Sequence, residues 1–215
     1  MIKKIVIGLK NKFFPNRQEI IIKRWKIQKG DKTLRLNYPN LNEKSIVFDV
    51  GGYEGQWTSD IYSKYNCNIF IFEPVNKFSE NIKKRFAKNK KIRVYELGLS
   101  NVTKIATISN EDDASSLHNG GNESIQLKSI CEFMKENKIN KIDLLKLNVE
   151  GEEYNILNNL ISTGFIKKVE QIQVQFHKNI KNYREEYFKI KDKLNKTHKL
   201  NWRFPFVWED WKKYE

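Results

Sequence analysis

The stretch that most constrains the fold of this chain is residues 47–57, where an apolar run ends in Asp49 and opens into a glycine-rich turn. Gly51, Gly52 and Gly55 allow the backbone to adopt positive φ and to come close to a ligand. Asp49 stands where a β-strand would end, so its carboxylate can accept hydrogen bonds at that edge. A strand that ends in such a turn predicts an open α/β sheet with a nucleotide-like cofactor over its edge.

The spacing of the turn distinguishes between classes of cofactor. Gly51 is followed directly by Gly52, so the turn is not the G-x-G-x-x-G of a dinucleotide-binding fold. Asp49, Gly51 and Gly55 match instead the D-x-G-x-x-x-G of enzymes that use S-adenosylmethionine (SAM). Glycine-rich turns between a strand and a helix also form for packing reasons alone, and that alternative stays open for the turn by itself.

Glu73 lies about 20 residues beyond the glycine turn, at the end of a second apolar run, where an acid typically binds the hydroxyl groups of a ribose. Pro74 has no N–H to give to a β-ladder, so it ends the strand and leaves the Glu73 carboxylate at the sheet edge. The alternative is that Glu73 only stabilises the N-terminus of the helix that follows. The pairing of turn and acid favours a cofactor that contains a ribose.

The remainder of the chain alternates strand and helix patterns, as a doubly wound, mostly parallel sheet requires. We expect strands at residues 45–50, 68–72, 92–97, 142–147 and 169–176, an edge strand at 101–108, and helices at 57–65, 77–88, 129–137, 152–163 and 183–194. A polar loop is expected at residues 111–122, and an aromatic-rich antiparallel hairpin at residues 198–208. One α/β domain over residues 41–215 would then follow a basic extension of residues 1–40, with a helix and a short strand.

The net charge indicates the kind of partner that this chain binds, and the cysteines indicate its cellular compartment. The 215 residues carry 40 Lys and Arg against 26 Asp and Glu, a formal net charge of +14. This excess favours an anionic partner such as nucleic acid, phosphate or an acidic membrane surface, or it is only a solvated basic surface. Cys67 and Cys131 have no metal-site spacing and fit a reducing compartment. Since no apolar run reaches the roughly 18 to 20 residues of a membrane span, we expect a cytoplasmic protein.

Residues 1–30 are strongly basic, with nine Lys or Arg against the single acid Glu19. Ile5, Leu9 and Phe13 lie among these cations at helical spacing. Such a segment predicts either a helix that lies on anionic lipid or a helix docked on the domain with its basic face toward solvent. A peripheral membrane contact through residues 1–30 is therefore one of two interpretations.

Polar side chains gather where two predicted strands end. By strand alternation Lys146, Asn148 and Glu150 share one face, and His177 follows the strand at residues 169–176. Ligands of open parallel sheets bind beyond the carboxyl ends of the strands, and imidazole titrates near neutral pH. We therefore expect His177 to act as a general base, with the other three beside it. The alternative is an exposed polar face beneath a loop.

These motifs resemble those of the FkbM-type family of SAM-dependent methyltransferases. The resemblance covers about residues 45–180 and is carried by VFDVGGYEG, IFEP, LGLS, ASSL and above all IDLLKLNVEGEE. It implies a Rossmann-like class I methyltransferase domain that uses SAM and O-methylates a sugar or related metabolite, such as a nucleotide-linked or lipid-linked sugar in polysaccharide biosynthesis.

The resemblance also implies roles by position. Asp49, Gly51 and Gly55 would hold the methionine end of SAM, and Glu73 the ribose; the full set assigned to the cofactor is Asp49, Gly51, Gly52, Tyr53, Gly55, Glu73, Pro74, Ser116 and Asn148. Ser116 would contact the cofactor from a loop. The acceptor side would consist of Lys146, Asn148, Glu150 and His177.

Two positions depart from the family pattern. Asn148 stands where the family usually has an acid, and Gln175 where it often has Glu. Asn keeps the hydrogen-bonding shape but cannot act as a base, so the base is His177 or Glu150, or the chain belongs to a branch with its own acceptor, or it binds SAM without turnover. With one carboxylate fewer, a divalent metal is not expected. An RNA methyltransferase, suggested by the charge, is a further alternative, although the Asp/Asn-Pro-Pro-aromatic motif of base methylases is missing.

Overall fold

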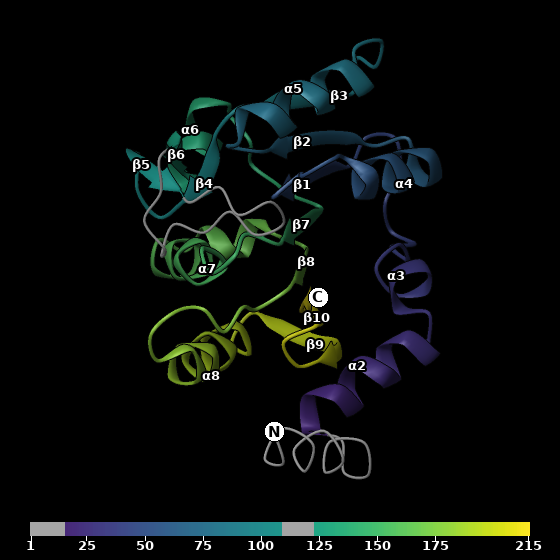
Figure 1. Cartoon of the computed structure of the whole chain (residues 1–215), viewed down its shortest axis with the longest axis vertical. Coiled ribbons are helices and arrows are strands. Elements are labelled where there is room, and N and C mark those ends of the chain that lie inside the picture. The colour runs from purple at the N-terminus through teal and green to yellow at the C-terminus, as the bar shows by residue number, and fades with distance from the viewer. Residues whose placement is uncertain (1–15, 109–122) are drawn as a thin grey trace, which may run out of the picture.

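The structure, a computed structural model, describes residues 16–108 and 123–215 (Figure 1). At its centre is a seven-stranded sheet in the order β3-β2-β1-β7-β8-β10-β9. The strands are β1 (Ile46–Val50), β2 (Asn68–Phe72), β3 (Ile92–Tyr95), β7 (Leu144–Leu147), β8 (Gln171–Val174), β9 (His198–Phe204) and β10 (Trp208–Lys213). The first five pair in parallel, and β10 is antiparallel to both of its neighbours. The expected doubly wound sheet with a C-terminal antiparallel hairpin is confirmed.

Helices cover both faces of this sheet (Figure 1). One face packs against α4 (Gln56–Tyr65) and α5 (Asn76–Arg85), and the other against α6 (Ile130–Glu136), α7 (Glu153–Ser162), the 3₁₀ helix η1 (Phe165–Lys168) and α8 (Tyr183–Leu194). Adjacent residues of β1 therefore enter different cores: Val47 belongs to the core that contains Ile61 of α4, whereas Phe48 belongs to the core that contains Leu157 of α7. Burial on both faces explains why the central strands are apolar runs rather than alternating patterns.

A second, three-stranded sheet is inserted between β3 and α6. It consists of β4 (Gly98–Ser100), β6 (Glu123–Ser129) and β5 (Lys104–Ile108) in that order. The strand expected at residues 92–97 is present as β3 but ends two residues earlier, because the chain leaves the main sheet after Tyr95. Strand β6 was not expected at all. Ile108, Ile125 and Leu127 of this sheet form a small core with Val75, which builds a wall at the carboxyl edge of the main sheet.

Between residue 16 and β1 the chain forms two helices, α2 (Arg17–Ile27) and α3 (Gly30–Thr33). Asn16 caps α2 and forms a reciprocal capping box with Glu19. Trp25 is the anchor of α2: it is buried, and its ring centroid lies 5.8 Å from that of Trp202 and 5.1 Å from that of Phe204 on β9. Between residues 16 and 40 the chain forms no strand, so the short strand expected there is absent from this part.

Three earlier expectations concern segments that the structure does not test. Ile5, Leu9 and Phe13, and the polar loop at residues 111–122, lie outside the described residues. The division of the chain near residue 40 stays a prediction.

None of the helices in the described ranges is both long enough and apolar enough to span a bilayer.

Candidate functional site

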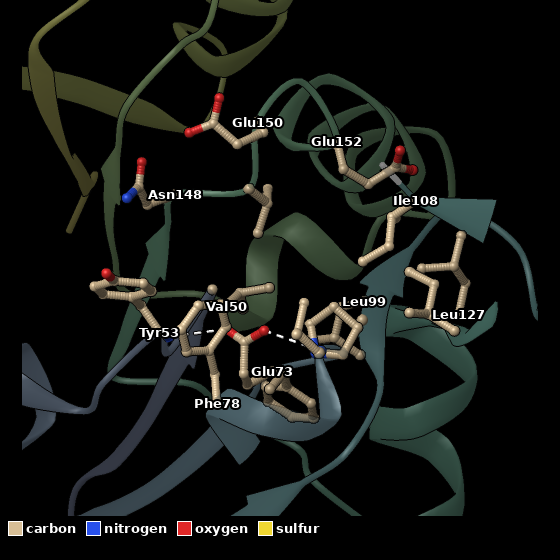
Figure 2. A pocket seen from close by; sticks show the side chains of 17 residues that line it. Val50, Tyr53, Glu73, Phe78, Leu99, Ile108, Leu127, Asn148, Glu150 and Glu152 are labelled. Atoms are coloured by element: carbon tan, nitrogen blue, oxygen red, sulfur yellow. Dashed lines mark hydrogen bonds between the residues drawn. The ribbon is translucent and has the colours of Figure 1, made fainter. Parts of the chain in front are cut away.

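A cleft of about 280 Å³ lies beyond the carboxyl ends of β1, β2 and β7 (Figure 2). Its polar lining includes Gly51, Tyr53, Glu73, Asn148, Glu150 and Glu152, and its apolar end includes Pro74, Val75, Phe78, Leu99, Ile108, Ile125 and Leu127. Figure 2 shows Asn148 and Glu150 on one side, Leu99 and Leu127 on the other, and the Glu73 carboxylate between them. The carboxyl edge of a parallel sheet is where open α/β folds bind their ligands.

The glycine turn is pressed against the end of β7. Gly51 has φ 84°, and a Cβ there would lie 2.0 Å from the carbonyl oxygen of Asn148. The N–H groups of Gly51 and Gly52 both donate to the carbonyl oxygen of Phe72, at 3.0 and 3.3 Å, which fastens the turn to β2. Gly52 and Gly55 pack against Ile82 and its neighbours rather than line the cleft. The turn is thus closely packed, and of its residues Gly51 and Tyr53 line the cleft.

Glu73 is the acid of the cleft floor. Its Oε2 accepts from the N–H of Tyr53 at 2.8 Å, and its Oε1 accepts from the N–H of Val75 at 3.0 Å. Burial raises the pKa of Glu73 to about 7, although the two backbone N–H groups act to lower it. Each carboxylate oxygen has a second lone pair, so both can accept a further hydrogen bond. This is the geometry that a vicinal diol requires.

Asp49 and Lys146 lie beneath the turn and do not line the cleft. Lys146 Nζ donates to Asp49 Oδ1 at 2.8 Å and to the carbonyl oxygen of Gly51 at 2.6 Å, while Asp49 Oδ2 accepts from the Thr58 hydroxyl at 2.6 Å. Both charged side chains are buried, and burial lowers the pKa of Lys146 although Asp49 acts to raise it. The geometry therefore supports a positioning role for Asp49 and Lys146, rather than the direct contacts with SAM and with the acceptor that were expected.

His177 lies between two carboxylates at the ends of β7 and β8. Its Nε2 is 3.1 Å from Glu150 Oε1, and its Nδ1 is 3.2 Å from Glu153 Oε1. Burial lowers the pKa of His177, but hydrogen bonds to Glu150 and Glu153 outweigh that effect and raise it to about 9. The ring is thus an imidazolium near pH 7. An imidazolium cannot accept a proton, so this geometry favours a positioning role for His177, and its expected role as the general base stays a prediction.

Glu153 holds this arrangement in place, and it was missed by the sequence reasoning. Its side chain is fully buried, and it accepts from the N–H groups of Gly151 and His177 at 2.9 and 2.7 Å. The loop that it braces contains Glu150 at φ 47°, a left-handed conformation that is strained for a residue with a Cβ. Glu150 is partly exposed and lines the cleft, whereas His177 lies behind it.

Asn148 lines the cleft with a side chain that is not fully satisfied. Its Oδ1 is buried and has no hydrogen-bond partner among residues 16–108 and 123–215. Leaving a buried acceptor unpaired costs about 1–3 kcal/mol, so a ligand group that donates a hydrogen bond would stabilise it.

Two other lining residues were not expected. Glu152 is buried at the apolar end, where its Oε1 accepts from the Ser100 hydroxyl at 2.6 Å and from Asn155 Nδ2 at 3.0 Å. Phe78 contacts the ring of Tyr53 with a centroid distance of 4.7 Å. Only their contacts with segments distant in sequence place them here, so no local sequence pattern indicated them.

The expected loop contact Ser116 lies outside the described residues, as does His118. The third histidine, His198, is buried, its Nε2 lies 2.9 Å from the carbonyl oxygen of Val169, and burial lowers its pKa, which indicates a structural role. Gln173 of β8 bonds the carbonyl oxygen of Arg35 and the hydroxyl of Tyr38 and does not reach the cleft. In the part of the chain that is described, no group of three or more His, Cys, Asp or Glu could hold a metal ion.

Comparison with known proteins shows which proteins this chain is similar to in sequence and in fold. A model of the methyltransferase FkbM domain matches residues 49–200, more than half of the chain. A putative rRNA-methylase from Clostridium thermocellum superposes with a TM-score of 0.53 at 12% identity, over 88% of this chain and 96% of that one. A putative methyltransferase from Streptococcus mutans in complex with S-adenosylhomocysteine (SAH) gives a TM-score of 0.50 at 10% identity, over 81% and 91%. A chain of a fibrillarin/Nop5p complex gives a TM-score of 0.51 at 14% identity, over 84% of this chain and 78% of that one.

At these identities the structural likeness shows the fold alone, that of class I methyltransferases. No curated protein matches the sequence. The match to the domain model includes the glycine turn, Glu73, the loop after β7 and the end of β8. All the described residues that line the cleft therefore lie within the matched region.

Proposed function

The chain belongs to the FkbM family of SAM-dependent methyltransferases, and from this premise we propose that it methylates a hydroxyl oxygen of a sugar or glycan precursor. The observation that carries the proposal is the arrangement of Asn148, Glu150 and His177 beside a cleft that has the donors and acceptors for SAM. A cytoplasmic role in polysaccharide biosynthesis belongs to the same proposal.

The residues of the cleft fit SAM in three respects. Glu73 offers two carboxylate oxygens to a ribose diol, and the apolar end at Val75, Leu99 and Ile108 suits a flat purine. The unpaired Oδ1 of Asn148 can accept from an ammonium group such as that of the methionine moiety. When bound, SAM supplies a methyl group on a positively charged sulfur, so the protein does not have to activate the methyl.

The protein must place the acceptor hydroxyl and remove its proton. This proton becomes strongly acidic as the new C–O bond forms, so a carboxylate is a sufficient base. Glu150 reaches the cleft, whereas His177 is already protonated and lies 3.1 Å behind it. We therefore assign proton removal to Glu150, orientation of Glu150 to His177, and orientation of the acceptor to Asn148. Fixing the reacting groups in this way supplies much of the rate enhancement of such a transfer.

An RNA methyltransferase is the second candidate, because the net charge of +14 suits a polyanion. The similarity to a putative rRNA-methylase at 12% identity does not strengthen it, since likeness at that level shows the fold only. Salt-sensitive binding of RNA together with methylation of RNA would favour this candidate. A third is a SAM-binding protein without turnover, because Asn148 and Gln175 are not acids; rapid formation of SAH with any natural acceptor would exclude it.

The proposal is tested with the full chain by calorimetric titration with SAM, followed by transfer of labelled methyl groups to a panel of free, nucleotide-linked and lipid-linked sugars. We expect Glu150→Gln to bind SAM as the unmodified chain does and to lose about 100-fold or more in kcat, the usual contribution of a general base. Glu43→Gln is the matched control, since Glu43 is an exposed acid away from the cleft. No binding of SAM would contradict the cofactor assignment, and full activity of Glu150→Gln would contradict the base.

A further inference from the structure

The outer face of α2 combines exposed aliphatic and basic side chains. Ile20 and Ile27 are 46% and 69% exposed and lie seven residues apart, on the same side of the helix. Lys23 and Arg24 lie between them on that side and are also exposed. We call these four residues the α2 face. Trp25, on the opposite side, is the buried residue of this helix, so the α2 face has no partner within the described protein.

The start of α2 lies against the segment that follows His177. Gln18 Nε2 donates to the carbonyl oxygen of Pro205 at 3.2 Å, and Gln18 Oε1 accepts from Lys178 Nζ at 2.9 Å. Lys178 is the residue directly after His177, and it is exposed. Further exposed cations follow at Lys181 and Arg184. Basic side chains thus extend from α2 to the acceptor side of the cleft.

We propose that the α2 face binds the surface of an anionic phospholipid membrane. Basic side chains are attracted to anionic headgroups, and aliphatic side chains between them enter the boundary between headgroups and acyl chains. Glu19 is the one acid among residues 1–30, and its carboxylate is already engaged by the backbone and side chain of Asn16 in the helix cap. The charge of this end of the chain is therefore complementary to an anionic surface.

The same face is less suited to nucleic acid. Proteins that bind single strands without sequence preference use exposed aromatic rings on which the bases stack. The aromatic residue of α2, Trp25, is buried against Trp202 and Phe204. Exposed isoleucines contribute nothing to binding a phosphate backbone, whereas a bilayer surface engages both kinds of side chain on the α2 face.

Gln18 lies seven residues before Trp25 and so on the docked side of α2, which puts Lys178 across the helix from the α2 face. Docking through the α2 face therefore does not by itself select an acceptor, and it does not rest on the proposed function. Vesicle binding and methyl transfer are separate measurements, so either can fail while the other holds.

The docking is tested by sedimentation of the full chain with vesicles of phosphatidylcholine that contain about one third phosphatidylglycerol, with pure phosphatidylcholine as the neutral reference. We expect binding to the anionic vesicles and little to the neutral ones. Raising NaCl from about 0.1 M to about 1 M shortens the Debye length from about 10 to about 3 Å and should weaken binding at least tenfold. Equal binding to both vesicle types would overturn the proposal.

Two pairs of variants locate the contact. Ile20→Ser/Ile27→Ser and Lys23→Glu/Arg24→Glu should each reduce vesicle affinity about tenfold or more. Ile105→Ser, at a residue 73% exposed on β5, is the control for lost apolar surface. Lys88→Glu/Lys90→Glu is the control for changed charge. Both lysines are exposed and lie between α5 and β3, at the other end of the molecule from α2 (Figure 1).

All variants are first titrated with SAM, which should bind each of them equally and shows that they are folded. The controls should keep vesicle binding within about twofold of the unmodified chain, since their exposed residues lie away from the α2 face. A loss shared equally by the α2 variants and the controls would overturn the proposal. So would binding of RNA by the same preparation without any binding of vesicles.

Discussion

Carboxylates meet cations in two places at the end of β7, and these two places define the chemistry there. Beneath the glycine turn, Lys146 and Asp49 are 2.8 Å apart and sealed from water. Beside the cleft, His177 contacts Glu150 and Glu153, and the Glu150 side chain is 31% exposed. A sealed pair can only hold the backbone around it in place. A pair that is open to the cleft can also exchange a proton with a bound molecule.

The pH dependence of methyl transfer distinguishes the two candidate bases. With His177 as a positioning cation, kcat/KM should fall as pH rises through about 9, because the imidazolium then loses its proton and its hold on Glu150. With His177 as the base, kcat/KM should instead rise toward pH 9. A profile from pH 6 to 10 measures the direction. Glu153→Gln removes one of the groups that raise the pKa of His177, so the fall should move to lower pH.

Single residues also show where sequence reasoning reaches its limit. Strand alternation placed Lys146 on one face with Asn148 and Glu150, but alternation holds only within a strand. Lys146 lies inside β7 and points toward Asp49, 97 positions away in the sequence, whereas Glu150 has left the strand at positive φ. The acids and amides of the site could be identified from the sequence. Their partners could not, because the partners are set by contacts between distant segments.

At the scale of elements, the glycine turn can be compared with the glycine that closes α7. Gly51 and Gly164 both have positive φ, 84° and 76°. A Cβ on Gly164 would meet nothing within 4 Å, whereas on Gly51 it would lie 2.0 Å from a backbone oxygen of Asn148. Gly164→Ala should therefore lower the free energy of unfolding only by the left-handed penalty, about 1–2 kcal/mol. Gly51→Ala should lower it further and abolish SAM binding.

Urea unfolding and calorimetric titration with SAM measure the two effects on the same samples. Gly164→Ala is the matched control, since it changes the same residue type at a similar φ but away from the cleft. Equal losses in the two variants would mean that backbone strain alone explains the glycine turn. Unchanged SAM affinity in Gly51→Ala would contradict the claim that the turn forms part of the cofactor site.

The elements that could be predicted are those whose own residues form an apolar run or follow a helical period. The apolar runs of β1 and β2 and the helical period of α8 placed these elements to within a residue. Strand β6 was missed because Ile125 and Leu127 are its only large apolar residues, and it gains its burial by pairing with β4 and β5. The apolar end of the cleft depends on this second sheet. The sequence therefore indicated the polar half of the site but not its apolar half.

At the scale of the whole molecule, charges are divided between a basic surface and several buried ionisable groups. The net charge of +14 is carried largely by exposed side chains such as those of α2. Glu73, Glu209 and Asp210 are buried, and burial raises the pKa of each, to about 7 for Glu73 and about 6 for Asp210. Toward neutral pH the folded state thus still holds protons that the unfolded chain has already released at lower pH.

Stability should accordingly fall with rising pH between about 5.5 and 9. The folded-state pKa of Glu73, about 7, is above its ordinary value of 4.5, so its contribution is fully present below pH 4.5 and is lost once pH has risen through 7. His177 follows the same rule at higher pH, because its folded-state pKa is about 9 against 6.5. Each group contributes a slope of at most about 1.4 kcal/mol per pH unit while it titrates.

Urea unfolding of the full chain without SAM at a series of pH values measures this decline. Glu73→Ala should flatten the decline below about pH 7 and leave the decline between about pH 7 and 9, because only the first belongs to Glu73. Glu96→Gln is the control: hydrogen bonds from Asn76, Lys83 and Ser79 lower the pKa of Glu96 to about 2, so it stays ionised in both states above about pH 5.5. A free energy of unfolding that is constant from about pH 5.5 to 9 would show that these groups are hydrated in the folded protein. It would then also remove the reason to treat His177 as a cation.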